Sequence, residues 1–202
     1  MPLTFTIDQD AITLVMESGL GRPLGTGFSF IKPSWIATAK HVVLFNGLPR
    51  QDLGVAALGK PAIKGRVLFA HPQVDLAVLE TESAVCMRPL FPSHHSLAGA
   101  GGLVCAGYAP SKTAEHGAYV VFVNEIPRFD VELRERDGLN EDLVVFDAEF
   151  SEGGHSGGPI FGSGGGVVGA IVESFRQESR LLARGTSLLP IVHYLGFPHE
   201  RA

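Results

Sequence analysis

The chain has 202 residues, of which 45% are hydrophobic and 18% are charged, and its formal net charge is -5. This composition predicts a folded chain rather than a disordered one, and the length is sufficient to bury a core. The acidic balance argues against a nucleic-acid-binding protein, which would carry clustered lysine and arginine.

The amino-terminal segment does not have the pattern of a targeting sequence. It lacks a basic start, and Asp8 and Asp10 lie where a signal peptide would be apolar. We therefore expect no secretory signal, no membrane span and a cytoplasmic location. The two cysteines, Cys86 and Cys105, are expected to be unpaired thiols of a reducing compartment, without the spacing of a metal pair.

Short apolar or alternating runs, separated by Gly, Pro, Asn and Asp, follow one another along the chain. They predict strands at 12–18, 25–32, 34–39, 65–70, 76–81, 102–108, 118–126, 129–136, 142–150, 158–162 and 167–175. One helix is predicted at 189–197, with Pro190 in its first turn and Gly196 at its end. Many short strands at this spacing predict an all-β sandwich or barrel. The linker-like segment 91–102 divides the chain into halves of similar size.

One glycine-rich stretch imitates a nucleotide-binding motif. "GGGVVG", Gly164 to Gly169, matches the dinucleotide fingerprint, which requires a helix directly after the glycines. Here a predicted strand follows, so we interpret the stretch as a hairpin turn.

Three polar residues lie beside predicted strands: His41 in "IATAKHVVLF", Asp75 in "HPQVDLAVLE" and Ser156 in "GGHSGGPI". Each alone is more typical of a structural role. Together they match the needs of nucleophilic catalysis, because a serine hydroxyl requires a base, and the base requires a group that fixes its tautomer. The glycines around Ser156 allow a sharp turn and leave backbone N–H groups available to a developing oxyanion.

The order of these residues and the words around them resemble the chymotrypsin/trypsin-like serine peptidases. "SWIATAKHV", "DLAVL", "GHSGGP" and "GVVGAIVES" are similar to that family's histidine turn, aspartate strand, serine loop and cleft strand, and "ARGTSLLPIVHYL" to its last strand and helix. The resemblance implies two six-stranded antiparallel β-barrels and a carboxy-terminal helix. It implies one peptidase domain over 1–202, with an amino-terminal barrel at about 1–92 and a carboxy-terminal barrel at about 100–202.

The resemblance also implies roles for individual residues. Ser156 is the expected nucleophile, His41 the general base and acid, and Asp75 the carboxylate that orients His41. The backbone N–H groups of Gly154 and Ser156 are expected to form the oxyanion hole. Expected substrate-binding residues are Phe150, Ser151, Val172, Glu173, Ser174 and Gly185. No metal or cofactor is implied, and the expected partner is a polypeptide substrate.

Two departures point to the bacterial, HtrA-like branch of the family. His155 occupies the place of the aspartate that pairs with a freed amino terminus in digestive members, and Val42 follows the histidine where a cysteine is frequent. The segment after Ser156 is too short for a carboxy-terminal PDZ domain, so we expect none.

The sequence leaves three functions open. The first is a serine endopeptidase acting through an acyl-enzyme, the second a protease-like peptide-binding module, and the third a conditional protease that an activating protein partner switches on. Specificity is also open, because Phe150 would favour apolar side chains while Glu152 and Glu173 would attract basic ones.

Overall fold

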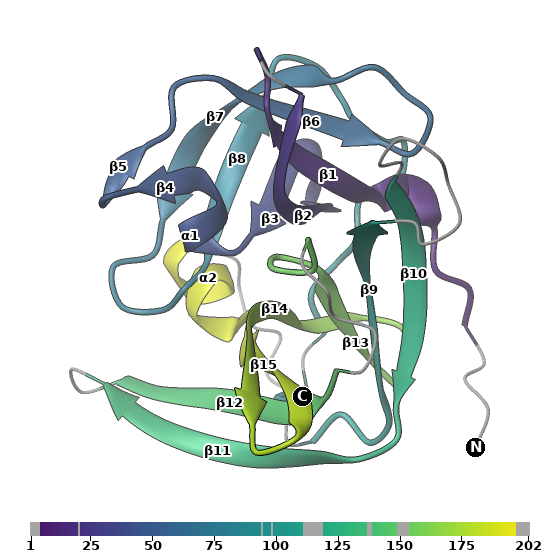
Figure 1. Ribbon diagram of the computed structural model, residues 1–202, viewed down its shortest axis with the longest axis vertical. Coiled ribbons are helices and arrows are strands. Elements are labelled where there is room, and N and C mark those ends of the chain that lie inside the picture. Colours follow the sequence, from purple (N-terminus) through teal and green to yellow (C-terminus); the bar gives the residue numbers. More distant parts are fainter. Residues whose placement is uncertain are drawn as a thin grey trace.

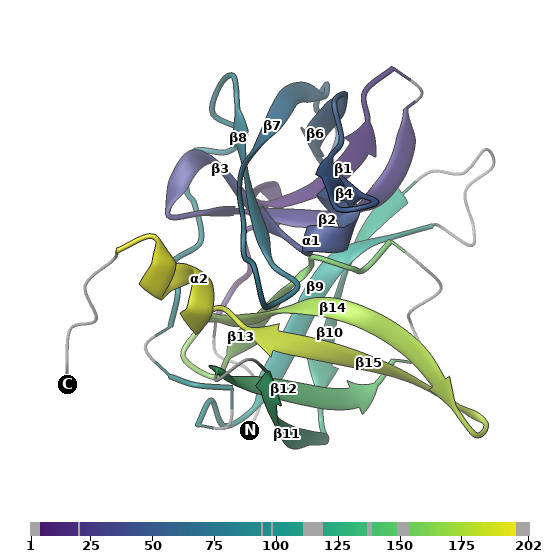
Figure 2. The same ribbon diagram turned by 90° about the vertical axis from the view of Figure 1, so that its left-hand side faces the viewer.

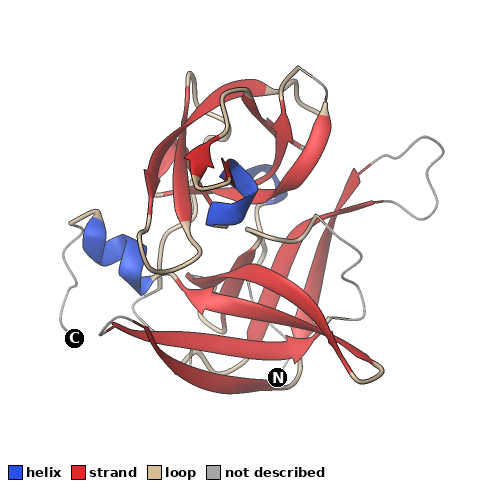
Figure 3. Ribbon diagram, turned by 60° about the vertical axis from the view of Figure 1, so that its left-hand side comes forward, coloured by secondary structure: helices blue, strands red, loops and turns tan. Residues whose placement is uncertain are grey.

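Strands dominate the computed structural model of the protein, and helices are few and short (Figure 3). The structure describes residues 5–19, 21–93, 95–97, 99–110, 119–136, 139–148 and 154–196. The all-β prediction is confirmed.

The amino-terminal half forms a closed barrel of six strands in the order β1-β2-β3-β8-β7-β6. These strands are β1 (Ile12–Glu17), β2 (Arg22–Phe30), β3 (Lys32–Thr38), β6 (Leu53–Ala57), β7 (Ile63–Ala70) and β8 (Ala77–Thr81). A 3-10 helix, η1 (Gln9–Ala11), precedes β1. Between β3 and β6 lie the short helix α1 (Lys40–Val43) and a small hairpin of β4 (Leu44–Phe45) and β5 (Leu48–Pro49).

The carboxy-terminal half forms one seven-stranded antiparallel sheet in the order β10-β9-β13-β14-β15-β12-β11. Its strands are β9 (Leu103–Pro110), β10 (Tyr119–Ile126), β11 (Phe129–Arg136), β12 (Leu139–Asp147), β13 (Pro159–Gly162), β14 (Val167–Gln177) and β15 (Arg180–Ser187). The edge strands β10 and β11 are consecutive in the chain, joined only by Pro127 and Arg128. The sheet must therefore curl until its edges approach each other (Figure 1).

The barrel and the second sheet lie one above the other (Figures 1 and 2) and share an apolar core. One buried cluster contains Phe28 and Leu76 from the first half together with Val104 and Phe161 from the second. Helix α2 (Leu189–Tyr194) returns to the barrel, where Tyr194 stacks on Phe69 with ring centroids 3.9 Å apart. The two halves of the chain therefore share one continuous apolar core.

The connector between the halves is pinned to both of them. Leu90 exchanges backbone hydrogen bonds with Ser29 and Ile31 of the barrel region, and Val167 of β14 bonds with Phe91 and Ser93. The start of the predicted linker is thus hydrogen-bonded to the barrel on one side and to β14 on the other.

The predictions of helix α2 and of a turn at Gly164 are confirmed. Helix α2 has Pro190 in its first turn and ends at Tyr194, shortly before Gly196, whose φ is 71°. The "GGGVVG" stretch is a turn leading from β13 into the antiparallel strand β14, not a nucleotide loop. Cys86 and Cys105 are both free and buried. No helix in the described part of the chain is long and apolar enough to cross a membrane.

Several elements were not predicted, and the physical reason is clear for two of them. Strand β6 contains Gly54, Ala56 and Ala57, which have weak β-propensity, and only its position between β1 and β7 makes it a strand. Helix α1 is a single turn of four residues, too short to give a helical period. It carries His41, so its position decides the geometry of the candidate site.

Candidate active site

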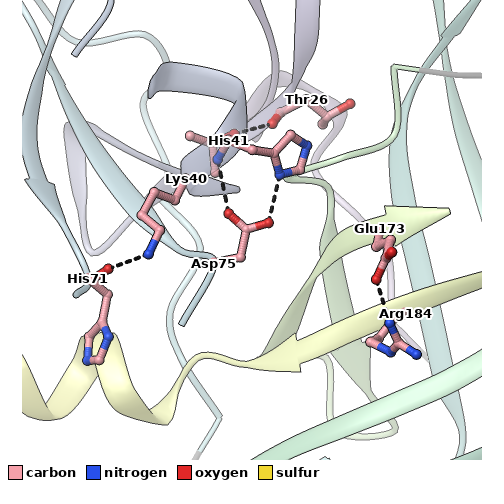
Figure 4. Close-up of polar contacts among 8 residues, drawn as sticks. Thr26, Lys40, His41, His71, Asp75, Glu173 and Arg184 are labelled. Atoms are coloured by element: carbon pink, nitrogen blue, oxygen red, sulfur yellow. Dashed lines mark hydrogen bonds and ion pairs between the residues drawn. The ribbon is translucent and has the colours of Figure 1, made fainter. Parts of the chain in front are cut away.

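His41 and Asp75 meet directly, although they come from separate loops. The Asp75 carboxylate receives two hydrogen bonds from His41: Oδ2 lies 2.7 Å from ring Nδ1, and Oδ1 accepts the backbone N–H at 3.0 Å (Figure 4). The backbone N–H of Lys40 also donates to the carbonyl of Asp75, at 3.2 Å. Asp75 therefore fixes the orientation of the His41 ring, because it is also hydrogen-bonded to the backbone of helix α1.

The charge of Asp75 is maintained in this half-buried setting. Burial alone would raise the pKa of Asp75, but the hydrogen bonds from His41 and the nearby charge of Lys40 outweigh it and leave the pKa below its usual value. The side chain of His41 is 49% exposed, so its other ring nitrogen is accessible to a reactant.

The turn that presents Asp75 is organised by His71. The ring Nδ1 of His71 accepts the backbone N–H groups of Gln73 and Val74 at 3.2 and 3.1 Å, and the carbonyl of His71 accepts Lys40 Nζ at 2.8 Å (Figure 4). His71 is only 5% exposed. The His71 side chain is therefore a buried support of the turn that carries Asp75.

The turn that carries Ser156 packs against the barrel beside helix α1. The carbonyl of Ser156 accepts the backbone N–H of Thr26 at 2.8 Å, and Gly157 donates to the carbonyl of Ile171 at 2.6 Å. A Cβ atom at Gly25 would lie 2.7 Å from the Ser156 carbonyl and 2.7 Å from a methyl of Val42, the residue after His41. The serine turn is thus packed against the barrel at the point where α1 begins.

Two glycines of the serine loop have backbone conformations that other residues rarely adopt. Gly154 has φ of 89° and Gly157 has φ of 90°. The carbonyl of Gly154 accepts the hydroxyl of Thr26 at 2.6 Å. A Cβ atom on Gly157 would overlap the carbonyl of Thr26 and the hydroxyl of Thr38, because these strands approach it so closely. The glycine content of the loop therefore reflects close packing rather than looseness.

His155 points into the protein. It is 1% exposed, and its ring packs on Phe122 with centroids 4.3 Å apart. Burial lowers the pKa of His155 from 6.5 to about 4. The residue that replaces the usual aspartate is thus a neutral aromatic core residue near pH 7.

The low pKa of His155 predicts an acid-sensitive fold. Between pH 6.5 and about 4 the unfolded chain binds the proton that the folded chain excludes, so the free energy of unfolding decreases as pH falls through this window. The slope due to this residue is up to about 1.4 kcal/mol per pH unit. We expect His155→Leu to lose that part of the pH dependence in urea denaturation series. An identical pH dependence in both proteins would contradict the prediction.

The expected substrate-binding residues on β14 lie along an open strand edge. Strand β14 pairs with β13 only as far as Ala170, whereas it pairs with β15 through Gln177. Among the described residues, the stretch from Val172 to Gln177 therefore has a neighbouring strand on one side only. This edge begins beside Gly157 and is interrupted by a bulge between Ile171 and Glu173.

The three predicted residues on this edge differ in environment. Val172 is 7% exposed and belongs to the barrel's apolar cluster, which includes Val42, while Glu173 and Ser174 are exposed. The carboxylate of Glu173 pairs with Arg184 Nη1 at 2.5 Å (Figure 4). A second carboxylate, Glu132, lies 3.8 Å from Arg184 Nε. Glu173 is therefore already neutralised by a neighbour, which weakens the expectation that it attracts a basic substrate side chain.

The remaining predicted residues are less informative. Gly185 is buried in the middle of β15, paired with Val144 and Ile171, and a Cβ atom there would overlap the side chain of Ile160. Phe150 and Ser151 lie outside the described residues, as does Glu152. Within the described part of the chain, no group of three or more His, Cys, Asp or Glu side chains is arranged to hold a metal ion.

The sequence did not identify the supporting residues. Thr26 and Arg184 contact the candidate site from other strands, so no local pattern marks them. The only available signal was the pair of glycines around Thr26, which indicates a close backbone approach at this point of β2.

Solved structures of bacterial proteases share this fold. The chain is similar to the Rv3671c protease from M. tuberculosis in its active form, with a TM-score of 0.68, 21% identity and coverage of 93% of this chain and 80% of that one. For the apo MamO protease domain from Magnetospirillum magneticum the TM-score is 0.65, with 18% identity and coverage of 92% and 96%. For the HtrA-type protease AlgW with a decapeptide, the TM-score is 0.64 and the identity is 17%, with coverage of 93% of this chain and 64% of that one. Identities at this level establish the fold alone.

The family itself is established by sequence. The family model of the trypsin-like peptidase domain matches residues 25–169, a range that contains His41, Asp75 and Ser156. Since this is more than half of the chain, the protein belongs to the trypsin-like peptidase domain family and is a serine endopeptidase of that family. No curated protein sequence matches the chain.

Proposed function

We propose that the protein hydrolyses peptide bonds through an acyl-enzyme, with Ser156 as nucleophile, His41 as general base and acid, and Asp75 as the orienting carboxylate. The observation that carries this proposal is the paired contact of Asp75 with both the ring and the backbone of His41. Support also comes from the packing of the Ser156 turn against the strand and helix that lead to His41.

The reaction would proceed in two halves. The hydroxyl of Ser156 attacks the scissile carbonyl while its proton passes to His41, and Asp75 stabilises the resulting imidazolium. His41 then gives the proton to the departing amine, which leaves an ester on Ser156. Water adds to this ester with His41 again as base, and the carboxylic acid product leaves with Ser156 restored. In both halves the backbone N–H groups of Gly154 and Ser156 would bind the oxyanion.

We further propose that the substrate binds as an added antiparallel strand on the open edge of β14. The edge from Val172 to Gln177 offers main-chain groups beside the serine turn, and an extended peptide there would gain affinity from main-chain hydrogen bonds. Glu173 and Ser174 would lie beside its side chains. Phe150, Ser151 and Gly185 remain predicted contributors to the primary pocket.

A fluorophosphonate probe tests the nucleophile. Wild-type protein should be labelled at Ser156 and should hydrolyse labelled casein, whereas Ser156→Ala should show neither property. Ser163→Ala is a matched control, because Ser163 is a loop serine whose hydroxyl donates to the carbonyl of Ala100, away from His41. Equal labelling of wild type and Ser156→Ala would refute the assignment.

A conditional form of the same activity is the second candidate. Rv3671c has been solved in an active and an inactive form with TM-scores of 0.68 and 0.67 to this chain, so this fold supports both states in a relative. An activating partner for this chain stays a prediction, as does its cytoplasmic location. Full casein hydrolysis by the isolated protein would exclude the requirement for a partner.

A further inference from the structure

Thr26 is a buried residue of the barrel that contacts the serine loop at two points. Its hydroxyl donates to the carbonyl of Gly154 at 2.6 Å, and its backbone N–H donates to the carbonyl of Ser156 at 2.8 Å. Its side chain is 0% exposed. The two acceptors lie on either side of His155, so one residue holds both ends of this short segment.

The hydroxyl of Thr26 both accepts and donates a hydrogen bond. Oγ1 accepts the backbone N–H of Tyr108 at 2.9 Å, so its own proton is directed to the carbonyl of Gly154. The carbonyl of Thr26 in turn accepts the hydroxyl of Thr38 at 2.7 Å. Thr26 therefore links β3, strand β9 of the second sheet and the serine loop through hydrogen bonds.

We propose that Thr26 is a positioning residue for the oxyanion hole. The peptide that carries the Ser156 N–H lies between the two peptides whose carbonyls Thr26 holds. Fixing these neighbours restricts rotation of the intervening peptide plane about ψ of His155 and φ of Ser156, which keeps the Ser156 N–H in one direction. This inference rests on the proposed function, since it concerns the donors of the same reaction.

This anchor is uncharged. Thr26 holds the loop through a neutral hydroxyl and a backbone N–H from β2, while His155 fills the core beside Phe122. Formation of the oxyanion hole is therefore coupled to docking of the barrel on the second sheet.

The test compares Thr26→Val, which has a similar shape but no hydroxyl, with Thr26→Ser, which keeps it. With a fluorogenic peptide chosen from a randomised pool, we expect Thr26→Val to lower kcat about 10- to 100-fold, since a buried carbonyl and N–H lose their partner. KM should change less than about twofold, because the loss falls on the transition state. The rate of fluorophosphonate labelling should fall in parallel, and Thr26→Ser should recover most of the activity.

Thr13→Val is the matched control. Thr13 is another fully buried barrel threonine, and its hydroxyl has no hydrogen-bond partner within the described residues. Its kcat should equal that of wild type. If Thr26→Val does not fold, Thr26→Ala, assayed at a temperature where its circular dichroism is native, takes its place.

The outcomes separate this proposal from the proposed function. A kcat of Thr26→Val within twofold of wild type overturns the role of Thr26, as does equal loss in Thr26→Ser or in Thr13→Val. Those results leave the function intact as long as Ser156→Ala is inactive. Activity in Ser156→Ala would instead overturn the function itself.

Discussion

Replacing Asp75 by asparagine should lower kcat by about 10⁴-fold, the scale expected when a catalytic histidine is held in the wrong tautomer. The asparagine carbonyl oxygen can still accept the backbone N–H of His41, which Oδ1 accepts at 3.0 Å in the native protein. Its amide NH₂ would then face ring Nδ1, where Oδ2 now lies at 2.7 Å. Nδ1 must accept, the proton moves to the other ring nitrogen, and that nitrogen can no longer take the proton of Ser156.

Asp147→Asn is the matched control for this prediction. Asp147 is a surface carboxylate at the end of β12, paired with Arg180 at 2.7 Å. Its replacement should leave kcat within about twofold of wild type, since surface ion pairs contribute little. Steady-state kinetics with a fluorogenic peptide measure both variants. A loss of less than tenfold in Asp75→Asn would contradict the assigned role of this carboxylate.

The second large effect is expected at Gly157, where a methyl group has no room. A Cβ atom there would lie 2.0 Å from the carbonyl of Thr26 and 2.2 Å from the hydroxyl of Thr38, and φ is 90°. We expect Gly157→Ala to destabilise the fold by about 3 kcal/mol or more, from overpacking together with backbone strain. Activity should be lost with it, because relief of the overlap would move the Ser156 turn away from His41.

Gly164 provides the comparison for this substitution. It lies in the turn after β13, and a Cβ atom there has nothing within 4 Å. Gly164→Ala should change the free energy of unfolding by no more than about 0.5 kcal/mol. Urea denaturation of the two alanine variants decides the matter: equal stability would show that the close approach at Gly157 is not a constraint on the fold.

The sequence predicted those residues of the candidate site that stand in short recognisable motifs. His41, Asp75 and Ser156 each stand in a short, typical segment, and the strand pattern around them was sufficient for the all-β class. Thr26 could not be found in this way, because it meets Gly154 across 128 positions of the chain. Strand β6 was missed for a related reason: Ala56 and Ala57 form a strand only because β1 and β7 bracket them.

His155 shows both the reach and the limit of such reasoning. Its place before Ser156 excludes the usual aspartate pairing, and this much can be read from the sequence. The contacts between Thr26 of β2 and the serine loop depend on how the barrel packs against the second sheet, which the sequence does not show. The burial of His155 against Phe122 is likewise decided by tertiary packing.

The open edge of β14 carries a hazard for the folded protein in the crowded cell. Unpaired main-chain groups invite a strand from another copy of the chain, which is the first step of edge-to-edge aggregation. This edge is interrupted by the bulge at Val172 and bears the exposed charged side chains Glu173 and Arg176. These features disfavour a long flat partner strand. A short extended segment would still fit, so in the proposed binding mode the same six residues would discriminate between a substrate and a second copy of the protein.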